Sequence, residues 1–311
     1  MGRLFASADI GGTSIKLGLV DETGYISFRD EIAYRKELGE ETVMQILIRG
    51  IKEMLGSEGL TSTDISGIGV SAAGCINSVT GSVAENGGNI PGWSFTQVTK
   101  ELTEEFGVPA TLANDANCAI LGEQWIGAAK GCSDVLGVTL GTGVGGGIIT
   151  GGRLLEGSRG YAGEIGHFPT HGGGRHCICG LAGCYERYAS TSALIRITSE
   201  VDAEWDNGRI FFEAAASGDK TALEILDDWI TEIAYGIAGF VHVFDPQIIL
   251  IGGGVSKQQK LLIEPLREKV ISMIMPDFAD GLEFRAAELG NDAGIVGAVR
   301  YLIGKLETSE Q

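Results

Sequence analysis

Asp9-Ile-Gly-Gly-Thr-Ser-Ile-Lys-Leu-Gly18 is echoed far along the chain by Thr139-Leu-Gly-Thr-Gly-Val-Gly-Gly-Gly-Ile148. Each segment places a turn of glycine and threonine between two apolar runs. This pattern predicts two strands joined by a tight turn. Two such hairpins in a chain of 311 residues predict two lobes whose turns face each other across a cleft.

The rest of the chain alternates between strand and helix patterns, which predicts an α/β fold. No change of composition marks the boundary between the lobes, so the pattern alone places it near Asn114. Helical spacing predicts two amphipathic helices, whose apolar faces carry Val43, Leu47, Ile51 and Met54 in the first and Val98, Leu102 and Phe106 in the second.

Composition argues against several classes of protein. The net charge of −18 and the pI near 4.6 disfavour binding to nucleic acid or to an anionic membrane. The N-terminal run before the first acidic residue is too short for a signal peptide. The apolar stretch from Ile233 to Ile251 is broken by His242 and Asp245, which predicts a helix followed by a strand, with no membrane span. Six cysteines, three of them clustered, are typical of the reducing cytoplasm.

The glycine-rich turns predict a nucleotide site. Gly141-Thr-Gly-Val-Gly-Gly146 matches the dinucleotide-binding string, but it leads into a strand pattern where that motif must open a helix. Either Gly/Thr turn alone would be explained more simply as a tight hairpin. Together with a third turn, Gly252-Gly-Gly-Val255, they favour a cradle of backbone N–H groups for phosphates.

Two carboxylates stand at the ends of predicted strands. Asp9 precedes the first glycine turn, where it could hold Mg²⁺ through water, or cap its own turn as an Asx residue. Asn114 and Asp115 follow a strand and open a helix, so Asp115 is either a helix N-cap or a general base for a hydroxyl nucleophile.

The segment from His167 to Glu186 predicts a metal site. Cys177, Cys179 and Cys184 lie within eight positions, and a histidine completes a Cys3His set that suits tetrahedral zinc. His171 and His176 compete with His167, which is favoured because it follows an ordered-looking run. A closed site of four ligands is structural, and the alternative is a loop of three free thiols. Glu164 and Glu186 border the segment, so the metal would act as a clamp for two carboxylates.

The chain resembles the ROK family of repressors, open reading frames and sugar kinases, near its bacterial glucokinase branch. The resemblance spans nearly the whole length, and its Gly-Glu-Ile-Gly-His and Cys-x-Cys-Gly motifs are highly specific. The motifs that carry it are Asp9-Ile-Gly-Gly-Thr-Ser-Ile-Lys16, Asn89-Ile-Pro-Gly-Trp93, Asn114-Asp115-Ala-Asn117, Leu140-Gly-Thr-Gly-Val-Gly-Gly-Gly147, Gly163-Glu-Ile-Gly-His167, Cys177-Ile-Cys-Gly-Leu-Ala-Gly-Cys-Tyr-Glu186 and Gly252-Gly-Gly-Val255.

The resemblance implies an actin-like (ribonuclease H-like) fold of two lobes, with MgATP in the cleft and a hexose between the lobes. The family's C-terminal helix packs back on the first lobe. This implies a small lobe of residues 1–114 with 293–311, and a large lobe of residues 115–292 that holds the zinc loop and nucleotide contacts.

The resemblance also implies a role for each matching residue. Asp115 would be the general base, and the histidine that matches His167 binds zinc and contacts the sugar in the family. The sugar would be held by Asn89, Asn114, Asp115, Glu164, His167 and Glu186. The nucleotide and its magnesium would be held by Asp9, Gly11, Gly12, Thr13, Lys16, Thr142, Gly143, Gly253, Gly254 and Val255. Structural zinc would be held by His167, Cys177, Cys179 and Cys184.

The expected reaction is phosphorylation of glucose to glucose 6-phosphate by ATP, in a homo-oligomer of two or four chains. Tyr161 departs from the small residues common at that position in the family, so fructose, an N-acetyl hexosamine or a β-glucoside is an alternative substrate. A sugar-responsive regulator without catalysis is the rival function. A repressor of this family would carry a helix-turn-helix region before the first strand, and Asp9 leaves little room for one.

Overall fold

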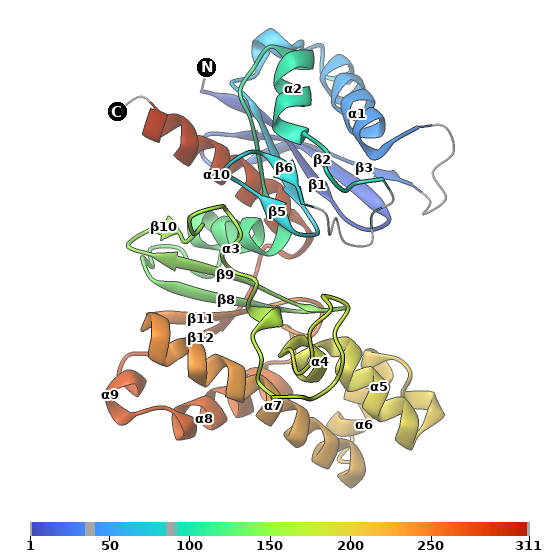
Figure 1. The fold of residues 1–311 in the computed structure, drawn as a ribbon, viewed down its shortest axis with the longest axis vertical. Coiled ribbons are helices and arrows are strands. Elements are labelled where there is room, and N and C mark those ends of the chain that lie inside the picture. The colour runs from blue at the N-terminus through green and yellow to red at the C-terminus, as the bar shows by residue number, and fades with distance from the viewer. Residues whose placement is uncertain (1, 35–40, 85–89, 91, 310–311) are drawn as a thin grey trace. The chain divides into compact units, whose positions relative to one another are not determined.

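The computed structural model describes residues 2–34, 41–84, 90 and 92–309. The chain packs into two compact units, each with its own sheet (Figure 1). The first unit comprises Met1–Lys130, Leu154–Ala162 and Asn291–Gln311. The second comprises Gly131–Arg153 and Gly163–Gly290.

The first unit is built on a five-stranded sheet of order β3-β2-β1-β4-β7. β1, β2 and β3 form antiparallel pairs, and β4 and β7 continue the sheet in parallel with β1. The predicted hairpin at Asp9 is therefore present, with Asp9 opposite Lys16. The strands are β1 (Leu4–Ile10), β2 (Ser14–Asp21), β3 (Ile26–Ala33), β4 (Ile68–Ala72) and β7 (Ala110–Asn114), and a separate hairpin joins β5 (Ile76–Asn77) to β6 (Ser82–Val83).

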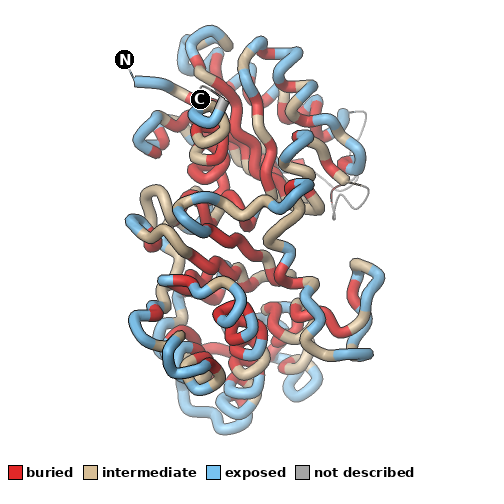
Figure 2. Tube along the Cα trace, turned by 60° about the vertical axis from the view of Figure 1, so that its left-hand side comes forward, coloured by how far each residue is buried: buried red, intermediate tan, exposed pale blue. Residues whose placement is uncertain are grey.

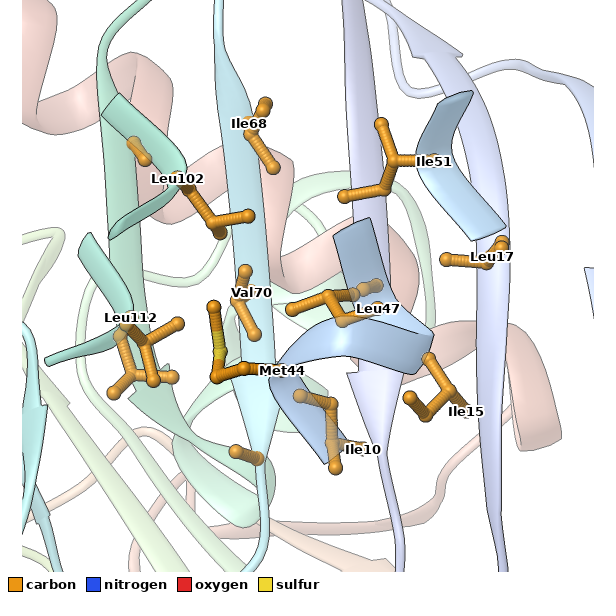
Figure 3. Close-up of a cluster of buried hydrophobic side chains, with 14 of the residues drawn as sticks. Ile10, Ile15, Leu17, Met44, Leu47, Ile51, Ile68, Val70, Leu102 and Leu112 are labelled. Atoms are coloured by element: carbon orange, nitrogen blue, oxygen red, sulfur yellow. The ribbon is translucent and has the colours of Figure 1, made fainter. Parts of the chain in front are cut away.

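Helices pack on this sheet because they carry the apolar faces that the sequence predicts. The four residues expected on the face of α1 and the three on the face of α2 are all buried. In the core, Leu47 and Ile51 of α1 lie over Ile15 and Leu17 of β2 (Figure 3). The helices are α1 (Val43–Ser57), α2 (Val98–Phe106), α3 (Asp115–Ile126) and α10 (Ala293–Ser309).

The second unit repeats the same arrangement of strands. Its sheet has the order β10-β9-β8-β11-β12, with β8 and β9 antiparallel and β11 and β12 parallel to β8. The two hairpins noticed in the sequence therefore occupy corresponding places in two sheets of one topology, and the central strands are buried in each (Figure 2). The strands are β8 (Val135–Leu140), β9 (Val144–Thr150), β10 (Arg153–Leu154), β11 (Ile248–Gly252) and β12 (Glu283–Ala286).

The helices of the second unit follow the segment that carries Cys177, Cys179 and Cys184. α7 ends at Phe244 because Asp245 adopts the left-handed conformation before Pro246. Among the described residues, no helix is long and apolar enough to cross a membrane. The helices are α4 (Glu186–Ala189), α5 (Thr191–Val201), α6 (Gly208–Ala216), α7 (Lys220–Phe244), α8 (Glu264–Met273) and α9 (Pro276–Ala279).

A backbone contact joins α10 to α3. A Cβ atom at Gly297 would lie 1.6 Å from the carbonyl oxygen of Cys118, so only glycine lets the helices approach this closely. Gly69 of β4 meets the backbone of Ala298 in the same way, at 2.5 Å. This packing groups α3 with the first unit. The lobe limits expected from the sequence, which begin the second lobe at Asp115, stay a prediction.

We expect Gly297→Ala to lower the free energy of unfolding by about 1–3 kcal/mol, because the added methyl group must push two helices apart. Gly304→Ala is the matched control in the same helix, since a Cβ there meets no described atom within 4 Å. Alanine favours a helix over glycine, so the control should be neutral or more stable by up to about 1 kcal/mol. Urea unfolding followed by circular dichroism measures both, and equal stabilities would contradict the prediction.

Candidate active site

Asp9 lies next to the last residue of β1, close to the beginning of α10. Its Oδ1 accepts a hydrogen bond of 2.6 Å from the Ser71 hydroxyl, and its Oδ2 lies 3.8 Å from the Lys16 ammonium. A Cβ atom at Gly294 would come within 2.7 Å of this carboxylate. Burial raises the pKa of Asp9, although Ser71 and Lys16 both lower it. The partners belong to other segments, so Asp9 does not cap its own turn among the described residues.

The turn after Asp9 is open on one side. A Cβ at Gly12 would meet no described atom within 4 Å, and Thr13 is exposed. Tyr34 fastens the turn by donating its hydroxyl proton to the carbonyl oxygen of Gly11 and its backbone N–H to that of Thr13. Burial raises the pKa of Tyr34 to about 12, so its hydroxyl stays a donor at neutral pH. The turn therefore has the fixed backbone and open face that a phosphate cradle needs.

Asn114 and Asp115 have different local roles. Asn114 is the N-cap of α3, and its Oδ1 accepts from the N–H groups of Ala116 and Asn117. Its amide nitrogen donates to the carbonyl oxygen of Gly74. Asp115 is the first residue of the helix and is exposed. The N-cap role weighed for Asp115 thus belongs to Asn114. Asn89 lies outside the described residues.

In the second unit, Glu186 is hydrogen-bonded to the β8–β9 turn. Its Oε2 accepts from the backbone N–H of Val144 at 3.2 Å. A Cβ at Gly143 would lie 2.1 Å from the same oxygen, so glycine is required for this approach. The turn is closed by a hydrogen bond from the Gly141 N–H to the Gly143 carbonyl oxygen, and Thr142 is its exposed corner.

The turn after β11 lies against the same segment. Gly253 has a φ of 92°, and a Cβ there would lie 2.1 Å from the carbonyl oxygen of Leu140. Gly254 has open space where a side chain would be, and Val255 is buried. The structure therefore brings together two of the three predicted glycine turns within the second unit.

Four predicted metal ligands gather in one cluster. The ligand atoms of His167, Cys177, Cys179 and Cys184 all lie within 4.8 Å of one another. The Cys179 and Cys184 sulfurs are 3.6 Å apart, and Cys177 Sγ is 3.7 Å from His167 Nδ1. A tetrahedral zinc with bonds of about 2.3 Å to sulfur separates its sulfurs by about 3.8 Å. The spacing of these donors therefore fits zinc.

The donor set also fits zinc, because thiolate sulfur and imidazole nitrogen are its usual ligands. Burial, with help from Cys179 and Cys177, raises the pKa of Cys184 to about 12. A bound metal ion removes such protons, because it stabilises thiolates directly. The competing histidine His171 stacks on Tyr188 with ring centroids 3.8 Å apart, and His176 is outside the cluster.

Two carboxylates flank the cluster, as the sequence suggests. Glu186 Oε1 is 3.8 Å from Cys177 Sγ. Glu164 is exposed, but protein atoms surround much of its carboxylate. The resulting partial loss of hydration raises the pKa of Glu164. His167 lowers that pKa and Glu186 raises it, so the three side chains share one neighbourhood. Glu164, His167 and Glu186 thus offer two acceptors and a ring at one place, as recognition of hydroxyl groups requires.

Comparison with known proteins shows which family the chain belongs to. The profile of the ROK family matches residues 5–304. The chain belongs to the ROK family. It is 36% identical to a glucokinase of Thermotoga maritima, across 94% of this chain and 95% of that protein. It is also 36% identical to a glucokinase of Halalkalibacterium halodurans, across 99% of this chain and 97% of that protein.

A solved structure supports the same family. The ROK family glucokinase of Streptomyces griseus, crystallised in complex with glucose and AMPPNP, superposes with a TM-score of 0.77 and 33% identity, and the match covers 95% of this chain and 97% of that one. The mixed α/β fold expected from the sequence is therefore that of ROK sugar kinases.

Sequence reasoning missed two residues of the first unit. Ser71 binds the Asp9 carboxylate from β4, and Tyr34 holds the glycine turn from the end of β3. Neither stands in a motif, and each reaches its partner through the register of neighbouring strands. Only the pairing of the strands reveals them.

We expect Asp9→Asn to be more stable than the original protein at pH 7 in metal-free buffer. Below about pH 3.8, the ordinary pKa of this group, Asp9 is protonated in both folded and unfolded chains. As the pH rises through the raised pKa of the folded state, a partly buried carboxylate must ionise and the original protein loses relative stability. Urea midpoints at pH 4 and pH 7 measure this.

The control for this experiment is Asp64→Asn, which should show the opposite trend. Hydrogen bonds from the backbone and hydroxyl of Thr61 lower the pKa of Asp64. Its ionised form therefore stabilises the folded chain above about pH 3.8, and that benefit is lost in the variant. An Asp9→Asn protein that is less stable at pH 7 would show that burial does not dominate at this carboxylate.

Proposed function

We propose that this protein transfers the γ-phosphoryl group of ATP to the 6-hydroxyl of a hexose, with glucose as the first choice. The enzyme is an ATP-dependent sugar kinase. The observation that carries the proposal is the hydrogen bond from Val144 to Glu186, because it joins a glycine turn suited to phosphates to a carboxylate suited to a sugar. The family and its glucokinase relatives support the same activity. The repeated sheet topology supports an actin-like arrangement of two lobes.

Phosphoryl transfer asks mainly for positioning, for neutralisation of charge and for a base near the attacking hydroxyl. Asp115 accepts the hydroxyl proton, and its exposure at the first turn of α3 supports that role. Glu164, His167 and Glu186 bind sugar hydroxyls. Thr13 and Thr142, with the glycines beside them, hold the phosphates.

Two metal ions have separate duties. Magnesium bound to ATP would neutralise charge on the phosphates, and Asp9 would hold it through water, which would account for a partly buried carboxylate beside Lys16. Zinc in the Cys3His cluster is structural, because four protein ligands leave no open position. It stiffens the loop between Glu164 and Glu186. The cytoplasmic location and the homo-oligomer expected from the sequence stay predictions.

A coupled ATPase assay with a panel of sugars tests the activity. Glucose should be consumed with formation of the 6-phosphate, seen by phosphorus NMR, whereas 6-deoxyglucose should bind without accepting phosphate. Tyr161 is half-buried with Arg159 5.8 Å from its ring, so a β-glucoside or an N-acetyl sugar could compete with glucose, as could fructose. Sugar binding without turnover on any of these sugars would favour a regulator, and phosphate on the anomeric hydroxyl would refute the proposed binding mode.

Asp115→Asn should lower kcat by roughly 10²–10⁴-fold, because the amide keeps the shape of the side chain but accepts no proton. Sugar affinity measured by calorimetry should change little. Glu101→Gln is the matched control, since Glu101 is an acidic residue in the first turn of α2. Loss of sugar binding in Asp115→Asn would make Asp115 a recognition residue and leave the base unassigned.

Cys179→Ser should lose metal and raise the KM for sugar, because Glu164 and Glu186 flank the loop that the metal stiffens. Elemental analysis of the original protein should give about one zinc per chain. Cys132→Ser is the control, since Cys132 is outside the cluster. Full activity in a metal-free protein would remove the proposed link between zinc and sugar.

A further inference from the structure

Three arginines meet beside the Cys3His cluster in the second unit. Arg187 lies in α4, Arg196 in α5 and Arg175 in the loop before Cys177. Arg175 Nη1 and Arg196 Nη2 donate to one acceptor, the carbonyl oxygen of Arg187, at 3.3 and 3.4 Å. Two guanidinium groups from separate segments thus meet at the backbone of a third arginine, whose charge also acts on Arg196.

This concentration of charge is not neutralised by ion pairs. Among the described residues, none of the three arginines has a carboxylate oxygen within 4.0 Å of its side-chain nitrogens. Glu186 adjoins Arg187, but its oxygens face Val144 and Cys177. Burial lowers the pKa of Arg196, and the charges of Arg175 and Arg187 lower it further, while Glu200 offsets part of the effect from a distance.

The Arg175 side chain is held in place before any ligand arrives, and Arg187 carries a donor that has no acceptor. The Arg175 guanidinium lies 4.9 Å from the centre of the Tyr188 ring, and the Tyr188 hydroxyl accepts from the Arg175 backbone N–H at 2.8 Å. His171 stacks on the same ring and stiffens it. Arg187 Nε is buried and has no hydrogen-bond acceptor among the described residues. An unsatisfied buried donor of this kind costs stability unless a partner binds.

A simpler role for these arginines is to cap the short helix α4. One cationic side chain near the last carbonyl groups is enough for that purpose. A cap explains neither a second guanidinium on the same oxygen nor the unsatisfied Nε of Arg187. Guanidinium groups match the oxygens of phosphate in geometry as well as in charge.

We propose that Arg175, Arg187 and Arg196 form a binding site for the dianionic phosphate group of a small molecule. The site goes beyond the proposed function, in which none of these residues binds ATP or sugar. The phosphate oxygens accept hydrogen bonds from the three guanidinium groups, including the buried Nε–H of Arg187. Because α4 begins at Glu186, a ligand here would bind next to a residue that the proposed function assigns to the sugar.

Isothermal titration calorimetry tests the site in the full-length, zinc-replete protein, with inorganic phosphate and methyl phosphate as separate probes. The protein is first saturated with AMPPNP and magnesium, so that the nucleotide site does not take up phosphate. We expect one phosphate per chain, with affinity that falls as salt is added. Binding of both probes indicates a site open to phosphate esters, and binding of inorganic phosphate alone indicates a site for the free ion.

Arg175→Gln and Arg196→Gln should each weaken phosphate binding about tenfold or more, because each removes charge-assisted hydrogen bonds. Arg175→Lys keeps the charge but loses the planar fork, so it should fall in between. Arg267→Gln, an exposed arginine of α8, is the control and should bind as the original protein does. Absence of binding by the original protein, or equal binding by all variants, would overturn the proposal.

A second measurement covers the case in which a glutamine variant fails to fold. The Nε–H signal of Arg187 in the NMR spectrum of the original protein should shift on addition of phosphate, whereas that of Arg267 should not. An unmoved Arg187 signal would also overturn the proposal. Both readouts are of binding, so an inactive kinase assay would sink the proposed function and leave this test unaffected.

Discussion

The hydrogen bond from the Val144 N–H to Glu186 Oε2 is the constraint on which the second unit's site depends. It exists only because residue 143 is glycine, whose missing side chain leaves room for the carboxylate. Glu186 also closes the segment that carries the three clustered thiols, with Oε1 3.8 Å from Cys177 Sγ. One carboxylate thus contacts both the β8–β9 turn and the cysteine loop.

In the first unit, the carboxylate that corresponds to Glu186 in importance is Asp9, which is partly buried. Asp9 is kept ionisable by Ser71 and Lys16, but the closeness of Gly294 and α10 removes water from it. Burying a carboxylate opposes folding, and the raised pKa of Asp9 expresses that cost. A protein selected for stability alone would have an amide here. The carboxylate is understandable if the same low-hydration environment strengthens its attraction to a cation when one is present.

The sequence predicts those features that depend on residues close together in the chain. The glycine turns between strands, the buried faces of α1 and α2 and the clustering of three thiols follow from spacing of a few residues, and His167 joins the thiols as expected. The sequence does not predict contacts between segments that are far apart in the chain. The packing of Gly297 on Cys118, the reach of Ser71 to Asp9 and the meeting of three arginines each depend on strand order or helix packing, which spacing along the chain does not encode.

The net charge of the chain likewise does not predict where cations cluster in the folded protein. A net charge of −18 argues against binding to long polyanions, where many phosphates must be met at once. It says little about a single phosphate group, because salt screens charges beyond about 8 Å at physiological ionic strength. Within that distance, Lys16 stands beside the first glycine turn, and Arg175 and Arg196 both donate to the carbonyl oxygen of a third arginine, Arg187. An acidic protein can therefore bind small anions wherever packing brings a few cations together and keeps its carboxylates turned elsewhere.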